Sequence, residues 1–214
     1  MISFVLMTAL TLSPISTDIV ITEVQIRSES RITIFNPGTK DLDISGFRLR
    51  RKSSTGREHS VRVFPRGSVI VAGGYFTWSN SKDDRHLDIG ADVWSTALLS
   101  NNNSISLVSP RGDIIDSVAW GSGKDQFLSG EAISLNPSEG QIIRRIFLDE
   151  GYRSTGDNSN DFELYPGTKL DVLKDTDIRT WTKERNDDTS PVAIGGGVAI
   201  LSTLSILMLK RAIF

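Results

Sequence analysis

Short apolar runs separated by turn residues fill positions 18–147 of the chain. Apolar and polar residues alternate with period two at 47–50 and 105–108, as expected for half-buried β-strands. Turn motifs such as Asn36-Pro37-Gly38 and Ser45-Gly46 end several of the runs. No long segment with the 3.6-residue period of a helix precedes residue 190. The pattern therefore predicts an all-β domain, a sandwich or barrel of short strands.

The turn residues also predict which strands are neighbours. The turn at Pro110-Arg111-Gly112-Asp113 joins 105–108 to 114–120, so we expect these two runs to form a hairpin. Residues 80–94 are polar and acidic and are expected to form a long loop. The expected strands are 19–26, 32–35, 42–44, 47–50, 61–63, 69–71, 75–78, 105–108 and 114–120.

The C-terminal region has the composition of a membrane span. Residues 192–209 contain no charged side chain, and this length is at the lower limit for crossing a bilayer. Lys210 and Arg211 follow directly, which places that end in the cytoplasm by the positive-inside rule. We therefore expect a single transmembrane helix at 191–209 and a short basic tail at 210–214. A buried helix of a soluble protein is the second interpretation, although the segment has no polar face.

The N-terminal region is expected to be an export signal. Residues 2–12 are apolar over the length of a signal peptide, so 1–17 is interpreted as one, although a positively charged start is missing. A first strand and a misplaced start codon are the alternatives. Residues 167–190 carry mixed charges and are interpreted as a polar juxtamembrane stalk. Together the two ends predict a cell-membrane protein with its N-terminal domain outside the cell.

Composition excludes several kinds of chemistry. The chain has no cysteine, which removes disulfides and thiolate metal sites, and it has only two histidines, His59 and His86. Neither histidine lies in a nucleophile motif such as G-x-S-x-G. The formal net charge of −2 does not favour a nucleic-acid partner. We therefore expect a protein without catalytic activity, metal or cofactor.

A cluster of basic residues is the strongest candidate for a binding site. Seven lysines and arginines lie between positions 48 and 66, with Glu58 as the one acidic residue there. If 47–52 and 61–65 form a hairpin, Phe47, Leu49, Val61 and Val63 face inward. The outer face then carries a candidate anionic-ligand patch made of Arg48, Arg50, Lys52 and Arg62. The alternative is a solvated face whose charge is balanced by Asp83, Asp84, Asp88 and Asp92.

Three further motifs have weaker functional interpretations. The oxygen-rich segment 157–161 offers calcium ligands but lacks the glycine and distal glutamate of an EF-hand, so a capping turn is the alternative. Arg111-Gly112-Asp113 matches an integrin-recognition tripeptide, although it also occupies a predicted turn. Asn102-Asn103-Ser104 is a formal glycosylation sequon.

An ordered series of motifs between residues 18 and 121 resembles a known family. The motifs are Ile21-Thr22-Glu23-Val24, Ile34-Phe35-Asn36-Pro37-Gly38, Leu42-Asp43-Ile44-Ser45-Gly46-Phe47-Arg48-Leu49, Phe64-Pro65-Arg66-Gly67-Ser68, Leu99-Ser100-Asn101 and Gly112-Asp113-Ile114-Ile115-Asp116-Ser117-Val118-Ala119-Trp120-Gly121. This set resembles the lamin tail domain family in its prokaryotic form, and 141–162 is similar to the arm that often follows the domain. The resemblance implies an immunoglobulin-like β-sandwich over residues 18–166. It also implies interaction and tethering in place of catalysis.

Three hypotheses about function follow. The first is a membrane-anchored extracellular module that binds a protein or an anionic polymer. The second is a structural envelope protein that associates with copies of itself, since edge strands can pair between molecules. The third is an accessory subunit of a surface hydrolase. Salt dependence of binding, concentration dependence of assembly and turnover of a substrate distinguish them.

Overall fold

The structure is a computed structural model that describes residues 19–27, 29–149 and 151–166. The chain divides into two units, residues 1–170 and 171–214, and every described residue belongs to the first. No helix in the described part is long and apolar enough to cross a membrane. The expected signal peptide (1–17), stalk (167–190), transmembrane helix (191–209) and basic tail (210–214) lie outside the described residues.

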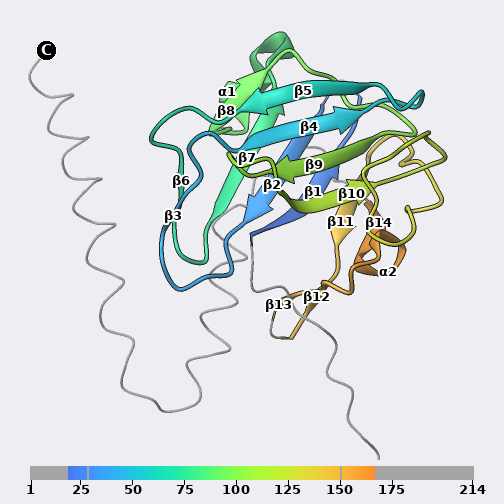
Figure 1. Ribbon diagram of the computed structural model, residues 1–214. Helices are drawn as coiled ribbons and strands as arrows, with labels where there is room; N and C mark the ends of the chain where they lie inside the picture. The colour runs from blue at the N-terminus through green and yellow to red at the C-terminus, as the bar shows by residue number, and fades with distance from the viewer. Residues whose placement is uncertain (1–18, 28, 150, 167–214) are drawn as a thin grey trace, which may run out of the picture. The chain divides into compact units, whose positions relative to one another are not determined.

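Two β-sheets form the body of the domain, and Figure 1 shows the smaller one in front of the larger. The larger sheet has six strands in the order β14 (Phe162–Pro166), β11 (Gln141–Arg145), β1 (Val20–Gln25), β2 (Arg31–Phe35), β7 (Tyr75–Asn80) and β8 (Val93–Ser95). The smaller has four in the order β10 (Ile114–Ala119), β9 (Ser104–Val108), β4 (Arg48–Lys52) and β5 (Glu58–Val63). The expected all-β fold is confirmed, and so is the hairpin of β9 and β10.

Short elements connect these sheets. Two small ladders pair β3 (Leu42–Asp43) with β6 (Val69–Ile70) and β12 (Phe147–Leu148) with β13 (Gly151–Tyr152). The expected long loop at 80–94 contains two short helical turns, η1 (Lys82–Asp84) and α1 (Arg85–Asp88), before β8 pairs in parallel with β7. A third turn, α2 (Asn158–Asp161), precedes β14.

The core lies between the inner faces of the two sheets. Alternating residues of the expected strands fill it, among them Ile21, Leu49, Trp78 and Trp120, all with no exposed surface. Phe47 packs against this core but is only partly buried. The period-two pattern thus predicted the inward-facing residues because each strand has one face in contact with the opposite sheet.

A segment after β10 covers part of the outer face of the four-stranded sheet. The Phe127 N–H donates to the Ser104 hydroxyl at 2.8 Å, and the hydroxyls of Ser117 and Ser129 are hydrogen-bonded at 3.1 Å. Ser104 and Ser117 are consequently buried although they face away from the core. The outer face is therefore solvated mainly at the β4–β5 side of the sheet.

The segment 141–166 is expected to be required for folding, because β11 lies directly against β1 and β14 lies against β11. Without them the apolar inner face of β1 loses its neighbours on one side. We expect residues 19–166 to unfold cooperatively in urea, followed by tryptophan fluorescence, and residues 19–140 to show no cooperative transition. An equal transition midpoint for the two chains would show that the arm is dispensable.

Candidate functional site

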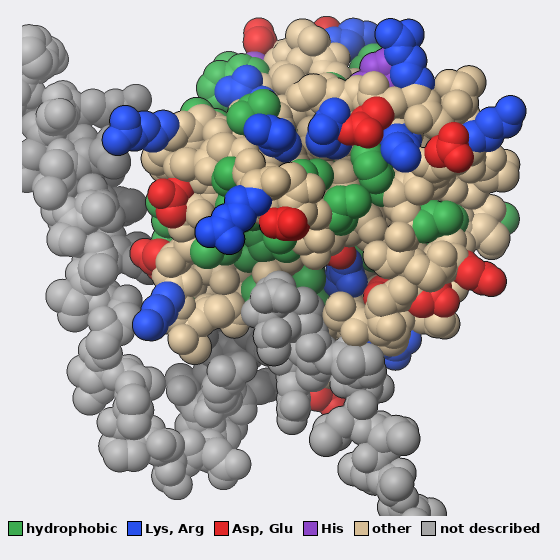
Figure 2. All heavy atoms as spheres, viewed as in Figure 1, with side chains coloured by type: hydrophobic (Ala, Val, Ile, Leu, Met, Phe, Trp, Pro, Cys, Tyr) green, Lys and Arg blue, Asp and Glu red, His purple; other side chains and the backbone are tan. Residues whose placement is uncertain are grey.

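The predicted basic patch lies on β4, with its side chains on alternate faces of the strand. Leu49 is fully buried, whereas Arg48 is exposed and Arg50 and Lys52 are half-buried. Across the ladder, Arg50 and Lys52 stand opposite Ser106 and Ser104 of β9. Because cross-strand partners share a face, Arg48, Arg50 and Lys52 lie together on the outer face of the sheet. Figure 2 shows lysine and arginine side chains gathered over β4 and β5, with acidic side chains among them.

A β-bulge removes Arg62 from this face. The ladder pairs Leu49 with Arg62 but the next residue, Arg50, with Ser60, so Val61 is the extra residue on β5. The bulge reverses the alternation, and Val63 is 50% exposed opposite Arg48. The expected inward position of Val63 is therefore wrong, as is the expected position of Arg62 beside Arg48 and Arg50.

Two members of the patch have partners within the domain. The Arg50 guanidinium forms an ion pair with Glu58 at 2.5 Å, and the Lys52 ammonium lies 4.7 Å from the centre of the Phe127 ring. Both contacts are partly solvated, so each stabilises the fold only modestly. We call the three residues Arg48, Arg50 and Lys52 the outer basic row.

Two side chains of the acidic loop make contacts within the domain. Asp92 accepts a hydrogen bond from the Thr77 N–H at 2.7 Å, and His86 stacks on Trp94 with ring centres 4.7 Å apart. Within the described ranges, no group of three or more histidine or carboxylate side chains is placed to hold a metal ion. Asp92 and His86 therefore help to hold β8 and the loop before it against the sheet.

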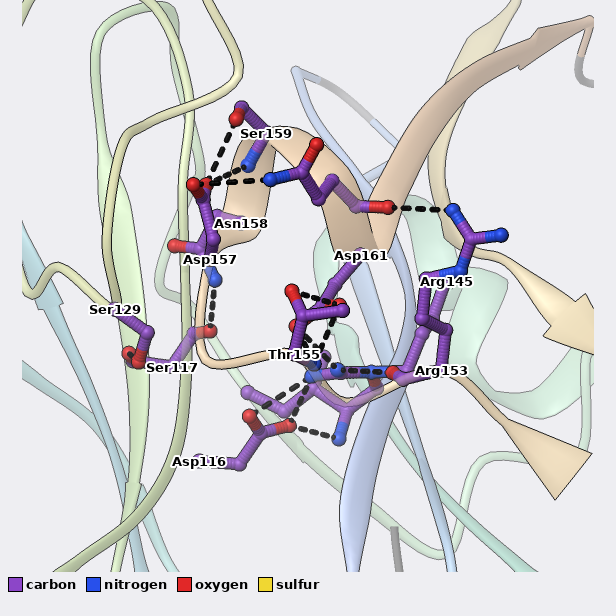
Figure 3. Close-up of polar contacts among 12 residues, drawn as sticks. Asp116, Ser117, Ser129, Arg145, Arg153, Thr155, Asp157, Asn158, Ser159 and Asp161 are labelled. Atoms are coloured by element: carbon purple, nitrogen blue, oxygen red, sulfur yellow. Dashed lines mark hydrogen bonds and ion pairs between the residues drawn. The ribbon is translucent and has the colours of Figure 1, made fainter. Parts of the chain in front are cut away.

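A buried arginine holds the two sheets together (Figure 3). Arg145 of β11 is 1% exposed, and its Nη2 donates to both carboxylate oxygens of Asp116 on β10 at 2.7 and 2.8 Å. Its Nε donates to the Ile21 carbonyl at 2.8 Å, and its Nη1 donates to the Arg153 carbonyl at 2.9 Å. Asp161 lies 3.7 Å from Nη1. Each of the three guanidinium nitrogens thus has at least one acceptor.

The same network provides hydrogen-bond partners for the main chain of Ile21, at the end of a strand ladder. The pairing of β1 with β11 includes Glu23 and Val24, so Ile21 lies beyond it. The Ile21 N–H instead donates to Asp116 at 2.6 Å, while its carbonyl accepts from Arg145. Burial raises the pKa of the Asp116 carboxyl, and the Arg145 charge and the Ile21 N–H act in the opposite direction. The pair is therefore costly to bury and requires all of these bonds together.

Asn158 caps the open edge of β10 in the manner of a neighbouring strand. Its side-chain oxygen accepts from the Ala119 N–H at 3.0 Å, and its Nδ2 donates to the Ser117 carbonyl at 2.8 Å. Asn158 is completely buried. The amide therefore replaces the main-chain partners that an edge strand lacks.

The segment 157–161 is a capping turn, with its carboxylates bonded to the chain itself. Asp157 is the N-cap of α2 and accepts from the Ser159 N–H at 2.9 Å and from the Glu131 N–H at 3.2 Å. Asp161 accepts from the N–H and hydroxyl of Thr155, both at 2.8 Å. These bonds favour the capping alternative over a calcium site.

The remaining motifs are also built into turns. Gly112 has a φ of 101° at the β9–β10 turn, and Asp113 accepts a hydrogen bond from the Ser109 hydroxyl at 3.2 Å. The sequon residue Asn102 accepts from the Ser122 N–H at 3.0 Å and from Asn136 Nδ2 at 2.9 Å. Sequence reasoning missed the roles of Arg145 and Asn158, because both act through contacts with distant residues.

Asp116→Ala is expected to destabilise the domain by about 3–5 kcal/mol, since it leaves the buried Arg145 without its bidentate partner. Glu58→Ala, which breaks the half-exposed pair with Arg50, should cost less than about 1 kcal/mol. Urea unfolding of both variants measures the difference. Equal costs for the two substitutions would contradict a central role for the Arg145 network.

Asn158→Ala is expected to lower the free energy of unfolding by about 2–4 kcal/mol, because two buried main-chain groups of β10 lose their partners. Asn160→Ala is the matched control, since Asn160 is exposed and bonds only to Asp157 through its side chain. Thermal unfolding should show a clear fall in Tm for the first variant and little change for the second.

Comparison with known proteins agrees with this architecture. The family model described as Lamin Tail Domain matches residues 13–122, just over half of the 214 residues. No curated protein matches the chain significantly. The family is an immunoglobulin-like one whose members generally act as non-catalytic binding modules. On the strength of this match and of its strand-rich fold, the chain belongs to the lamin tail domain family.

Proposed function

We propose that the chain is a non-catalytic binding and tethering module of prokaryotic lamin tail type, exposed outside the cell. In this proposal, residues 191–209 anchor it in the membrane and 1–17 direct its export. The uncharged run at 192–209 followed by Lys210 and Arg211 supports the anchor. The generally non-enzymatic character of the family supports the absence of catalysis.

The observation that carries the binding role is the outer basic row. Arg48, Arg50 and Lys52 project at every second position from a sheet whose opposite face is packed into the core. A rigid strand therefore presents these cations at regular spacing. An extended anionic polymer or an acidic protein surface is the partner that such a row attracts.

Self-association is the second candidate function. β5 is the outermost strand of the four-stranded sheet, and Val63 on it is half exposed. An edge strand with an exposed apolar side chain can pair with the same strand of a second copy. Sedimentation of the full chain over a range of concentrations tests this candidate, because assembly of this kind rises with concentration and is insensitive to added polymer.

The topology is tested on intact cells with one epitope tag after Thr17 and a second after Phe214. We expect added protease to remove the first tag and spare the second, because the positive residues after the span hold that end inside. Permeabilised cells, in which both tags should be lost, are the control. Protection of the first tag in intact cells would refute the extracellular assignment.

A further inference from the structure

Two arginines lie on the opposite side of the β4–β5 pair from the outer basic row. Arg51 stands across from Ile105, and Arg62 stands across from Leu49, and both of these apolar partners are fully buried. Cross-strand partners share a face of the sheet, so both arginines start on the core-facing side. Arg62 is on the edge strand β5, and Arg51 is next to the last residue of β4. Both side chains are half-buried, and we call their position the rim of the sandwich.

Neither arginine has an acceptor for the buried part of its guanidinium. The Nε atoms of Arg51 and Arg62 are buried without a hydrogen-bond partner. The Arg31 Nε is also buried without a hydrogen-bond partner, but that guanidinium forms an ion pair with Glu23 at 3.5 Å. Arg50 and Arg145 are likewise paired, with Glu58 and Asp116. A guanidinium that is partly desolvated and unpaired is costly in a folded protein, so its retention needs an explanation.

A third nitrogen group joins this pair. His59 is the cross-strand partner of Arg51 on β5. Burial lowers the pKa of His59, and the positive charges of Arg51 and Arg57 lower it further. The Arg51 charge is also partly desolvated, and burial lowers its pKa. The electrostatic environment of the rim is therefore positive, which favours an anion over a cation or a neutral group.

We propose that Arg51 and Arg62, with His59 beside them, form a binding site for a tetrahedral oxyanion ester, either phosphate or sulfate. The inference rests on the proposed function, because the ester would belong to the anionic polymer outside the cell. A guanidinium fork binds two oxygens of such a group at once. A phosphate or sulfate ester has three terminal oxygens and can serve both forks, whereas a carboxylate has only two.

Immobilised stems make this rim better suited to specific binding than the outer basic row. Since the Nε atoms are buried, the two side chains lose little further freedom when their terminal nitrogens meet a ligand. Arg48, in contrast, is exposed. We therefore expect the outer basic row to supply general attraction and the rim to supply the oriented contact.

The test uses the full chain in a neutral detergent with two probes, inorganic polyphosphate and a sulfated polysaccharide, in isothermal titrations at several salt concentrations. Arg51→Gln with Arg62→Gln is compared with Arg48→Gln with Arg50→Gln, which removes the same charge. We expect the first pair to weaken binding of at least one probe about tenfold or more beyond the second pair. A selective loss of affinity for polyphosphate indicates a phosphate site, and a selective loss for the sulfated polysaccharide indicates a sulfate site.

Arg51→Lys with Arg62→Lys keeps the charge and removes the fork, so it should also lose the oriented contact. Chemical modification of arginines in the unaltered protein gives a readout that needs no variant. Arg51 and Arg62 should be protected from phenylglyoxal by the bound probe, while Arg48 stays reactive.

Equal weakening by the two glutamine pairs, or no protection of Arg51 and Arg62, would overturn the site and leave general polymer binding intact. Full binding by the lysine pair would overturn the fork arrangement. Failure of the unaltered protein to bind either probe would overturn both the site and the anionic-polymer function. A cytoplasmic location with selective binding would leave the site standing and refute only the extracellular role.

Discussion

The contact between Arg145 and Asp116 is the constraint on which the rest of the domain depends. It joins β11 of one sheet to β10 of the other and satisfies the N–H and carbonyl of Ile21 beyond the β1–β11 ladder. Apolar packing alone would allow the two sheets to slide, because dispersion and the hydrophobic effect have little directionality. A bidentate ion pair with fixed geometry defines one register for the sandwich.

The network also explains why the fold extends beyond the segment that matches the family. Residues 13–122 contain Asp116 but not Arg145, Asn158 or Asp161. Those three side chains come from β11 and α2. Arg145 and Asn158 contact β10 directly, and Asp161 lies 3.7 Å from Arg145. The arm thus completes the polar interior of the domain in addition to supplying two strands. A sandwich without it would leave Asp116 without the arginine that pairs with it.

Sequence reasoning predicted the inward residues of most strands because burial of one face leaves a period-two pattern. It could not predict the bulge at Val61, since a single extra residue depends on how β5 fits its partner. Val63 and Arg62 were misplaced for that reason. Arg145 had a usable signal, because it follows Ile143 at the spacing that puts both on the inner face. The pairing of Arg145 with Asp116 could not be predicted from the sequence, because Asp116 lies 29 positions earlier.

The antiparallel pairing of β14 with β11 has a mechanical consequence. The ladder runs from the Gln141–Pro166 pair to the Arg145–Phe162 pair. Tension applied at Pro166 would act on the terminal pair of the ladder. The hydrogen bonds between β14 and β11 would then break one after another. Peeling of this kind needs little force until it reaches Phe162, which lies 4.2 Å from the Arg145 guanidinium and next to the buried Asp161. At that point the Arg145 contacts resist further separation. The last strand can therefore detach under tension while the two sheets stay packed together.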